Sequence, residues 1–284
     1  MEIKNVCILG AGTLGSRIAL QAALSGYSVR VYDIQDQALE SSKKVMAKIL
    51  RQLSLPTQTL ESILFTTDPA IAVENADIIS ESVTEDLALK QQVWAQFGAI
   101  APEKTIFTTN TSYLLPSQIA DFTGRPSLFC AFHFHDVFYS TVVDIMPHSG
   151  TSEHLISILE DFGRALNQVP VVVRKENHGY IFNSMLMALI GSAGKLRTKE
   201  VASIEDIDKS WMVNFHMPMG PFGILDSIGL DTAWHVTHKL EDPASQAFAS
   251  LVKTYIDAGK LGEKTGEGFY TYPNPAYRDP DFLN

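Results

Sequence analysis

Two side chains in the middle of the chain have the types and the spacing of an acid/base pair. His133 ends the apolar run 128–133, and Asp144 lies within the next apolar run, 142–146. If these runs form adjacent strands, the carboxylate can orient the imidazole and stabilise its charged form, an arrangement suited to proton transfer near neutral pH. The alternative is a purely structural pair, because a buried carboxylate needs a polar partner in any case.

Polar residues near this pair extend the candidate site. Asn110 and Ser112 follow another apolar run, 105–109. They can offer an amide and a hydroxyl to an oxygen of a cofactor or substrate, or else begin a following helix. His133 and His135 have the spacing of two ligands on one strand face, but the sequence offers no third ligand with suitable spacing, so we expect no metal.

The start of the chain has the pattern of a dinucleotide-binding loop. The apolar run 6–9 is followed by GAGTLG, residues 10–15, and then by a helical pattern. In such a loop the first glycine allows a tight turn, the second lets the backbone approach a pyrophosphate, and the third lets the helix pack closely on the strand. The helix N-terminus then faces the phosphates. The expected cofactor contacts of this loop are Gly10, Gly12, Thr13, Leu14 and Gly15.

A carboxylate after the second strand specifies the form of the dinucleotide. The apolar run 29–32 ends on Asp33. A carboxylate in this place accepts hydrogen bonds from the adenine ribose hydroxyls and repels a 2′-phosphate, so we expect NAD(H) rather than NADP(H). A glycine-rich turn of purely structural use is the alternative.

Alternating strand and helix patterns position these residues. They predict an α/β fold, a Rossmann-type doubly wound sheet over residues 1–175, with its site at the carboxyl ends of the strands. From residue 176 the patterns are helical, which predicts an all-α domain over 176–284. Its first helix, 181–195, is apolar nearly all round and is expected to be buried, and 273–284 is expected to be a loose arm. The expected strands are 6–9, 29–32, 65–68, 76–81, 105–109, 127–133, 142–146 and 169–174.

The composition excludes several classes of function. The 284 residues carry a formal net charge of −10, which argues against a general role in binding nucleic acid or an anionic membrane. The most apolar run, 181–193, is too short to span a membrane. Cys7 and Cys130 lie in apolar runs, as expected of buried thiols. Because a strand pattern begins close to Met1 in place of a secretory signal, we expect a cytoplasmic protein.

These motifs together resemble the 3-hydroxyacyl-CoA dehydrogenase family, and the similarity covers nearly all of the chain. The resemblance implies a Rossmann domain followed by a helical domain that usually forms a homodimer. The blocks that carry it are GAGTLG with Asp33, ESVTEDLALK, NTS, AFHF, GYIFNSML, MGPFGILDSIGLDT and LGEKTGEGFYTY.

The resemblance also implies further contacts to the cofactor. Glu85 and Lys90 would contact the nicotinamide ribose, and Asn110 would line the nicotinamide pocket. Lys264 would reach the cofactor from the C-terminal segment.

The catalytic roles follow from the same resemblance. His133 would be the general base that takes the 3-hydroxyl proton while hydride passes to the nicotinamide. Ser112 would hydrogen-bond the substrate oxygen. Asn183 would help to fix His133 and the substrate carbonyl.

The segment after the histidine departs from the family pattern. The family continues as HFFNPVP and reaches a glutamate twelve residues after the histidine, whereas this chain reads HFHDVFYSTVVD over 133–144. The carboxylate therefore arrives one residue early and is Asp144. We expect Asp144 to be the partner of His133, and Asp136, in the place of the family's asparagine, is its rival.

The resemblance implies an NAD-dependent oxidoreductase of fatty acid metabolism that interconverts 3-hydroxyacyl and 3-ketoacyl compounds, with a small-molecule substrate such as a CoA thioester.

The altered segment and a shortened arm, 43–67, weaken the case for CoA. They favour, as an alternative, non-CoA 3-hydroxy acids or esters, as in relatives of the L-gulonate 3-dehydrogenase (lambda-crystallin) or bacterial diketoreductase type. A non-catalytic NAD-binding structural protein, crystallin-like, is an alternative of another class. The joint presence of Ser112, His133 and Asn183 argues against it.

Overall fold

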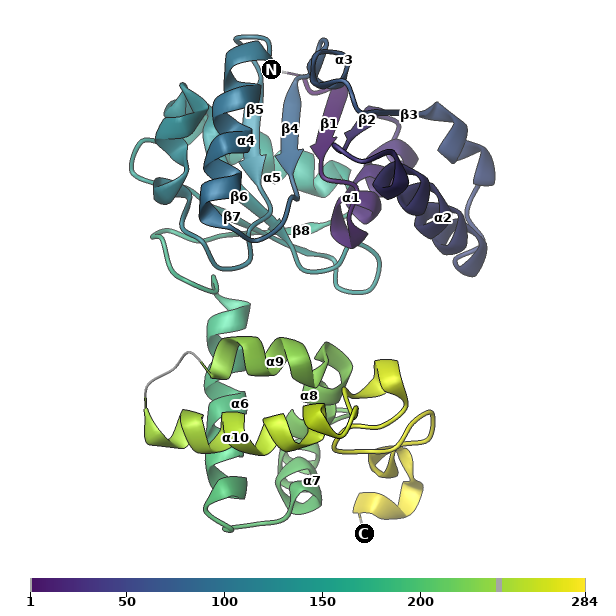
Figure 1. The fold of residues 1–284 in the computed structure, drawn as a ribbon, viewed down its shortest axis with the longest axis vertical. Helices are drawn as coiled ribbons and strands as arrows, with labels where there is room; N and C mark the ends of the chain where they lie inside the picture. The colour runs from purple at the N-terminus through teal and green to yellow at the C-terminus, as the bar shows by residue number, and fades with distance from the viewer. Residues whose placement is uncertain (1, 239–241, 284) are drawn as a thin grey trace. The chain divides into compact units, whose positions relative to one another are not determined.

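The computed structural model describes residues 2–238 and 242–283. The chain divides into two compact units, Met1–Ile181 and Phe182–Asn284 (Figure 1). The boundary between them lies a few residues beyond the expected residue 175.

The first unit is built on one eight-stranded sheet, which confirms the predicted α/β class. Its strand order is β3-β2-β1-β4-β5-β6-β7-β8. Neighbours pair in parallel except for β6 and β7, which are antiparallel. The order reverses between β1 and β4, the place where a doubly wound sheet binds its ligand. The strands are β1 (Asn5–Leu9), β2 (Ser28–Tyr32), β3 (Ile63–Thr66), β4 (Ile78–Glu81), β5 (Ile106–Thr109), β6 (Phe129–Phe134), β7 (Val142–Met146) and β8 (Val169–Val172).

Helices cover both faces of this sheet, and β1 shows why its sequence is apolar throughout. Successive strand side chains point to opposite faces. Val6 and Ile8 pack in one cluster with apolar residues of α1 (Thr13–Leu24), α2 (Asp36–Gln52) and α5 (Glu153–Ala165). Cys7 and Leu9 pack in the other cluster with α3 (Pro69–Val73) and α4 (Leu87–Ile100). A strand buried on both sides needs an unbroken apolar run.

The second unit is helical, as expected. Its helices are α6 (Phe182–Thr198), α7 (Ile204–Phe215), α8 (Pro221–Ile228), α9 (Leu230–Thr237) and α10 (Pro243–Asp257). Side-chain caps begin two of them: Ser203 accepts from the Asp206 amide at α7, and Asp242 from the Ser245 amide at α10. Among residues 2–238 and 242–283, no helix combines the length and the apolar character of a membrane span.

Two expectations for this unit are wrong. The helix α6 is not buried all round: its buried residues are Ile190, Ala193 and Gly194, and Met185 is 61% exposed. The C-terminal segment is not a loose arm either. It forms two short 3-10 helices, and their Tyr277 and Phe282 are buried in the core of the unit.

Candidate active site

The glycine loop joins β1 to α1 with the geometry that its sequence predicts. Gly10 has φ +101°, and a Cβ there would lie 2.7 Å from the Ser82 carbonyl oxygen. A Cβ on Gly15 would clash with the Gly10 carbonyl, so the close contact of helix and strand requires glycine. Gly12 is the N-cap of α1 and has open space beside it, which leaves room for a phosphate at the helix N-terminus. Thr13 and Leu14 open the helix.

A pocket of about 550 Å³ adjoins this loop. It is lined by Gly10, Gly12 and Thr13 together with Asp33 and residues that follow β4. The Asp33 carboxylate accepts hydrogen bonds from the Ala11 amide (2.9 Å) and the Gln35 amide (3.1 Å). The pocket combines a helix N-terminus, a close backbone approach and a carboxylate, so its residues fit an adenine dinucleotide.

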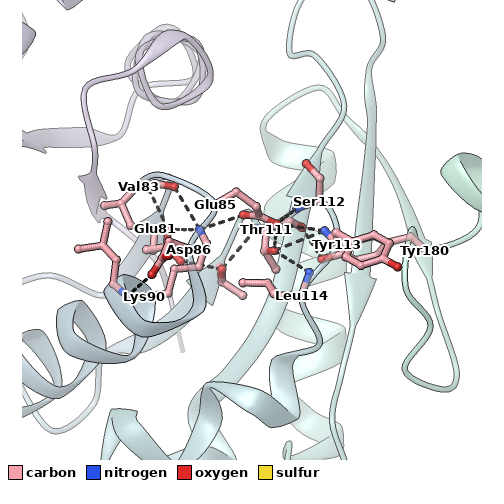
Figure 2. Close-up of polar contacts among 12 residues, drawn as sticks. Glu81, Val83, Glu85, Asp86, Lys90, Thr111, Ser112, Tyr113, Leu114 and Tyr180 are labelled. Carbon is pink, nitrogen blue, oxygen red and sulfur yellow. Dashed lines mark hydrogen bonds and ion pairs between the residues drawn. The ribbon is translucent and has the colours of Figure 1, made fainter. Parts of the chain in front are cut away.

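A buried ion pair supports the loop between β4 and α4 (Figure 2). Glu81 and Lys90 are 0% and 1% exposed, and Lys90 Nζ lies 2.6 Å from Glu81 Oε1. Glu81 also accepts from the Val83 amide (2.8 Å) and the Thr109 hydroxyl (2.7 Å). Glu81 is therefore the centre of this network, a role that the sequence analysis did not assign.

Glu85 extends the network to the segment after β5 (Figure 2). Its Oε1 accepts from the amides of Ser112 (3.1 Å) and Tyr113 (3.2 Å) and from the Thr111 hydroxyl. Lys90 Nζ lies 3.3 Å from its other oxygen. The structure thus brings Glu85, Lys90 and Ser112 together, with Lys90 enclosed behind Glu85.

Asn110 joins this segment to the histidine strand. It directly follows β5, and its side-chain oxygen accepts from the Phe134 amide at 2.7 Å. The bond lies one residue beyond His133, so the ends of β5 and β6 are held together at the candidate site.

His133 and Asp144 face each other across the antiparallel β6–β7 pair. His133 Nδ1 lies 3.3 Å from Asp144 Oδ2, and both side chains are buried. Asp136, the rival carboxylate, forms an ion pair with Arg17 and accepts from the Phe138 amide. Asp144 is therefore the carboxylate beside the imidazole.

Burial and hydrogen bonding determine the charges of this pair. Burial lowers the pKa of His133, and the hydrogen bond to Asp144 opposes that effect. Burial alone would raise the pKa of Asp144, but its hydrogen bonds with His133 and His135 hold that pKa below the usual value. A neutral imidazole beside an ionised carboxylate is the form of the pair that can accept a proton.

Tyr180 contacts the candidate base, a placement that was not predicted from the sequence. Its ring stacks on His133, with 4.7 Å between centroids and an interplanar angle of 17°. Its hydroxyl donates to the Thr111 carbonyl oxygen at 2.7 Å. Tyr180 has φ +54°, a rare value for a bulky residue that is typically kept at functional sites. It lies in the block GYIFNSML, from which we had selected only Asn183.

His135 contacts the Asp144 carboxylate, which was also not predicted from the sequence. Its Nε2 lies 2.7 Å from the same Asp144 oxygen that faces His133. His133, His135 and Asp144 each offer a possible metal-ligand atom within 4.8 Å of the others, a grouping that the sequence did not reveal. The 2.7 Å separation, however, has the length of a hydrogen bond and is shorter than the roughly 3.3 Å between two ligands of one zinc ion. We interpret the three as a hydrogen-bonded cluster.

Two expected site residues belong to the second unit. Asn183 lies in the first turn of α6. Lys264 lies in a 3-10 helix, Glu263–Thr265, and its ammonium contacts both oxygens of Asp231 at 2.5 and 2.7 Å. Their roles toward the substrate and the cofactor stay predictions.

Comparison with known proteins gives matches over nearly the whole chain. Family models of the 3-hydroxyacyl-CoA dehydrogenase NAD binding domain and C-terminal domain match residues 5–177 and 179–272. Human mitochondrial hydroxyacyl-coenzyme A dehydrogenase is 34% identical over 95% of this chain and 91% of its own length. The probable 3-hydroxybutyryl-CoA dehydrogenase of Bacillus subtilis (strain 168) is 31% identical over 96% of this chain and 98% of its own.

Solved structures show the same similarity. A diketoreductase, described as catalysing reactions of dicarbonyl compounds, superposes with a TM-score of 0.92 and 38% identity, over 96% of this chain and 100% of that one. The (S)-3-hydroxybutyryl-CoA dehydrogenase from Ralstonia eutropha superposes with a TM-score of 0.84 and 30% identity, with the same coverage.

Proposed function

This chain belongs to the 3-hydroxyacyl-CoA dehydrogenase family and is an NAD-dependent oxidoreductase, and from that premise we propose that His133 is the acid/base residue of its reaction. The reaction interconverts a 3-hydroxyacyl and a 3-ketoacyl compound. The observation that carries the proposal is the His133–Asp144 pair across β6 and β7. It lies beside Asn110, whose oxygen holds the next residue of the strand.

The pair performs proton transfer as follows. Bound NAD supplies the acceptor for the hydride that leaves C3 of the alcohol. His133 Nδ1 faces Asp144, so Nε2 is the nitrogen that takes the 3-hydroxyl proton. The carboxylate stabilises the imidazolium formed. In the reverse direction the imidazolium returns the proton as the carbonyl oxygen becomes an alkoxide.

The neighbouring residues position the reactants in this proposal. Ser112 hydrogen-bonds the substrate oxygen, and the bond from its amide to Glu85 fixes its backbone. Glu85 contacts the nicotinamide ribose, with Lys90 held behind it. Asn183, from the second unit, holds the substrate carbonyl. Lys264, also from the second unit, reaches the cofactor.

Two substrate classes are in competition. The hydroxyacyl-CoA and hydroxybutyryl-CoA relatives favour a CoA thioester. The diketoreductase favours a non-CoA 3-keto acid or ester. The short connection between α2, which ends at Gln52, and β3, which begins at Ile63, supports the non-CoA substrate class. We propose the acyl-CoA reaction, in fatty acid metabolism, as the principal activity.

We also propose that the protein is a cytoplasmic homodimer. Apolar side chains of α6, α7 and the turn after α7 are exposed: Met185, Val213, Phe215 and Met217. An exposed apolar set of this kind suits a second copy of the chain. Both cysteines are free and buried, which suits a reducing compartment.

The first test is NADH oxidation with acetoacetyl-CoA beside free and esterified 3-keto acids. We expect turnover with the thioester. A preference for the free acid or ester would favour the diketoreductase-like alternative, and no activity on any of them would favour a structural NAD-binding protein.

The second test concerns the proposed base. His133→Ala should lower turnover by about 10²- to 10⁴-fold, the usual contribution of a general base, with NADH still bound. His154→Ala is the matched control, because this histidine is exposed on α5. Asp144→Asn should lower activity far more than Asp136→Asn. Near-normal turnover in His133→Ala would remove His133 from the mechanism.

A further inference from the structure

One carboxylate oxygen serves two imidazoles. Asp144 Oδ2 lies 3.3 Å from His133 Nδ1 and 2.7 Å from His135 Nε2. The shorter bond is to His135, the residue for which the reaction has no stated use. His133 lies in β6 and His135 directly follows that strand, and the two ring centroids are 4.9 Å apart.

Sharing fixes opposite tautomers in the two rings. An ionised carboxylate only accepts hydrogen bonds, so each ring must present an N–H to Asp144. Neutral His133 therefore carries its proton on Nδ1 and keeps a lone pair on Nε2. Neutral His135 carries its proton on Nε2.

We propose that His135 is a positioning residue for the reaction: it binds the Asp144 carboxylate in competition with His133 and thereby limits how firmly that carboxylate keeps a proton on the base. This rests on the proposed role of His133. A base that serves both directions must release its proton as readily as it takes one, and a carboxylate committed to one imidazole would favour the charged form.

The groups around His133 agree with a carboxylate that is shared between two imidazoles. His133 is faced by Asp144 from β7, His135 from the segment just after β6, Glu85 from the loop before α4 and the stacked ring of Tyr180. Burial lowers its pKa most, the hydrogen bond to Asp144 raises it, and His135 lowers it again. The pKa of Tyr180 is raised, mainly by burial, so its phenol stays neutral.

His135 has its own anchors among the first-unit residues. Besides Asp144 and His133, its amide donates to the Val142 carbonyl oxygen at 3.3 Å. The charged residue next to it in sequence, Asp136, is paired with Arg17. His135 is thus held by the same β6–β7 ladder that aligns the catalytic pair.

Nitrogen-15 NMR of the protein tests the sharing without any mutation of His135. We expect the Nδ1–H tautomer for His133 and the Nε2–H tautomer for His135 near neutral pH. In Asp144→Asn the low-field N–H proton signals of both rings should move upfield, because both lose the same acceptor. Movement of the His133 signal alone would overturn the proposal.

Variants of His135 test the consequence. In His135→Phe the carboxylate is left to His133, so the titration midpoint of His133 should rise by about one pH unit, the scale of one nearby charge or hydrogen bond. In His135→Gln the side-chain amide still offers an N–H near the position of Nε2, so the carboxylate stays shared and the rise should be smaller. His154→Phe, on exposed α5, should leave the midpoint unchanged.

The same shift should appear in kinetics. The rise with pH of alcohol oxidation and the fall with pH of ketone reduction should both move to higher pH in His135→Phe, with KM changed little. An unchanged profile in a folded His135→Phe would overturn the inference. The NMR titration needs no turnover, so it separates failure of this inference from failure of His133 as the base, which His133→Ala reports.

Discussion

The two units bury carboxylates in different ways. In the first unit, Glu81 meets the ammonium of Lys90, Asp77 meets Lys104, and Asp144 meets two imidazoles. Among the described residues of the second unit, the donors that reach the buried acids Asp208 and Asp226 are neutral. Asp208 accepts from the Phe222 and Gly223 amides and the Tyr270 hydroxyl, and Asp226 from the Phe269 and Tyr270 amides and the Tyr272 hydroxyl.

The difference is matched by the direction of the pKa shifts. Burial raises the pKa of Asp208 to about 6 and also raises that of Asp226. For Asp77 and Asp144 burial acts in the same direction, but their partners outweigh it and the pKa values are lowered. The Lys104 ammonium beside Asp77 and the imidazole N–H groups beside Asp144 favour the ionised carboxylate. Asp208, which is held by two amides and a phenol, joins α7 to the start of α8.

The largest effect should come from removing the cation of the first unit's buried pair. Lys90→Met leaves Glu81 charged and buried without its counter-ion. We expect the free energy of unfolding, measured with denaturant, to fall by about 3–5 kcal/mol. A loss below 1 kcal/mol would show that the Val83 and Thr109 donors suffice for Glu81, and the contrast between the units would disappear.

The next effect should appear as a pH dependence of the second unit. Asp208 has a raised pKa in the folded state, so its contribution to stability is complete below its unfolded value near 4 and is lost as the pH rises through about 6. The loss should be roughly 3 kcal/mol, since one pKa unit corresponds to about 1.36 kcal/mol. Denaturant unfolding of the parent protein and Asp208→Asn from pH 4 to 7 measures it. The variant should lack this slope, and equal slopes would exclude Asp208 as its source.

A smaller effect of opposite sign is expected from Asp77. Its pKa is lowered in the folded state, so its contribution is present above the unfolded value and is lost as the pH falls through the folded one. Asp77→Asn should cost about 1–2 kcal/mol at pH 7, the scale of hydrogen bonds to a charged group, and less at acidic pH. A cost that grows on acidification would contradict this assignment.

The smallest effect should come from Lys104, the exposed partner of Asp77. Its side chain is 56% exposed, so the ion pair is screened by solvent. Lys104→Met should change the free energy of unfolding by less than about 1 kcal/mol, and added salt should reduce the difference. The amides of Lys4 and Asn5 still hold Asp77 at 2.9 Å in this variant. A loss as large as that of Lys90→Met would mean that burial of the cation does not matter.

Local patterns were sufficient for the sheet and the nucleotide loop. Gly10 and Gly15 are required because a Cβ at either position would clash with backbone atoms in this turn. Strands buried on both faces are recognisable in the sequence as unbroken apolar runs. The juxtaposition of His133 and Asp144 was predicted on the condition that their two apolar runs form adjacent strands, and the β6–β7 pair meets that condition.

Contacts that depend on the exact placement of side chains could not be predicted from the sequence. The shorter hydrogen bond of Asp144 is to His135, and it depends on the exact register of β6 and β7. The stacking of Tyr180 on His133 depends on a rare backbone conformation. Hydrophobicity alone misled in two places. It predicted burial for α6, and it missed that Tyr277 and Phe282 anchor the C-terminal segment.

Asp33 has two roles, and both bear on any change of the cofactor preference. Its carboxylate holds the Ala11 amide of the glycine loop and also lines the pocket in which we expect the adenine ribose. Replacing it with a small neutral residue to admit a 2′-phosphate also removes the acceptor for that amide. Engineering toward NADPH therefore requires two coordinated changes, a cation for the phosphate and a new acceptor that keeps the loop in shape.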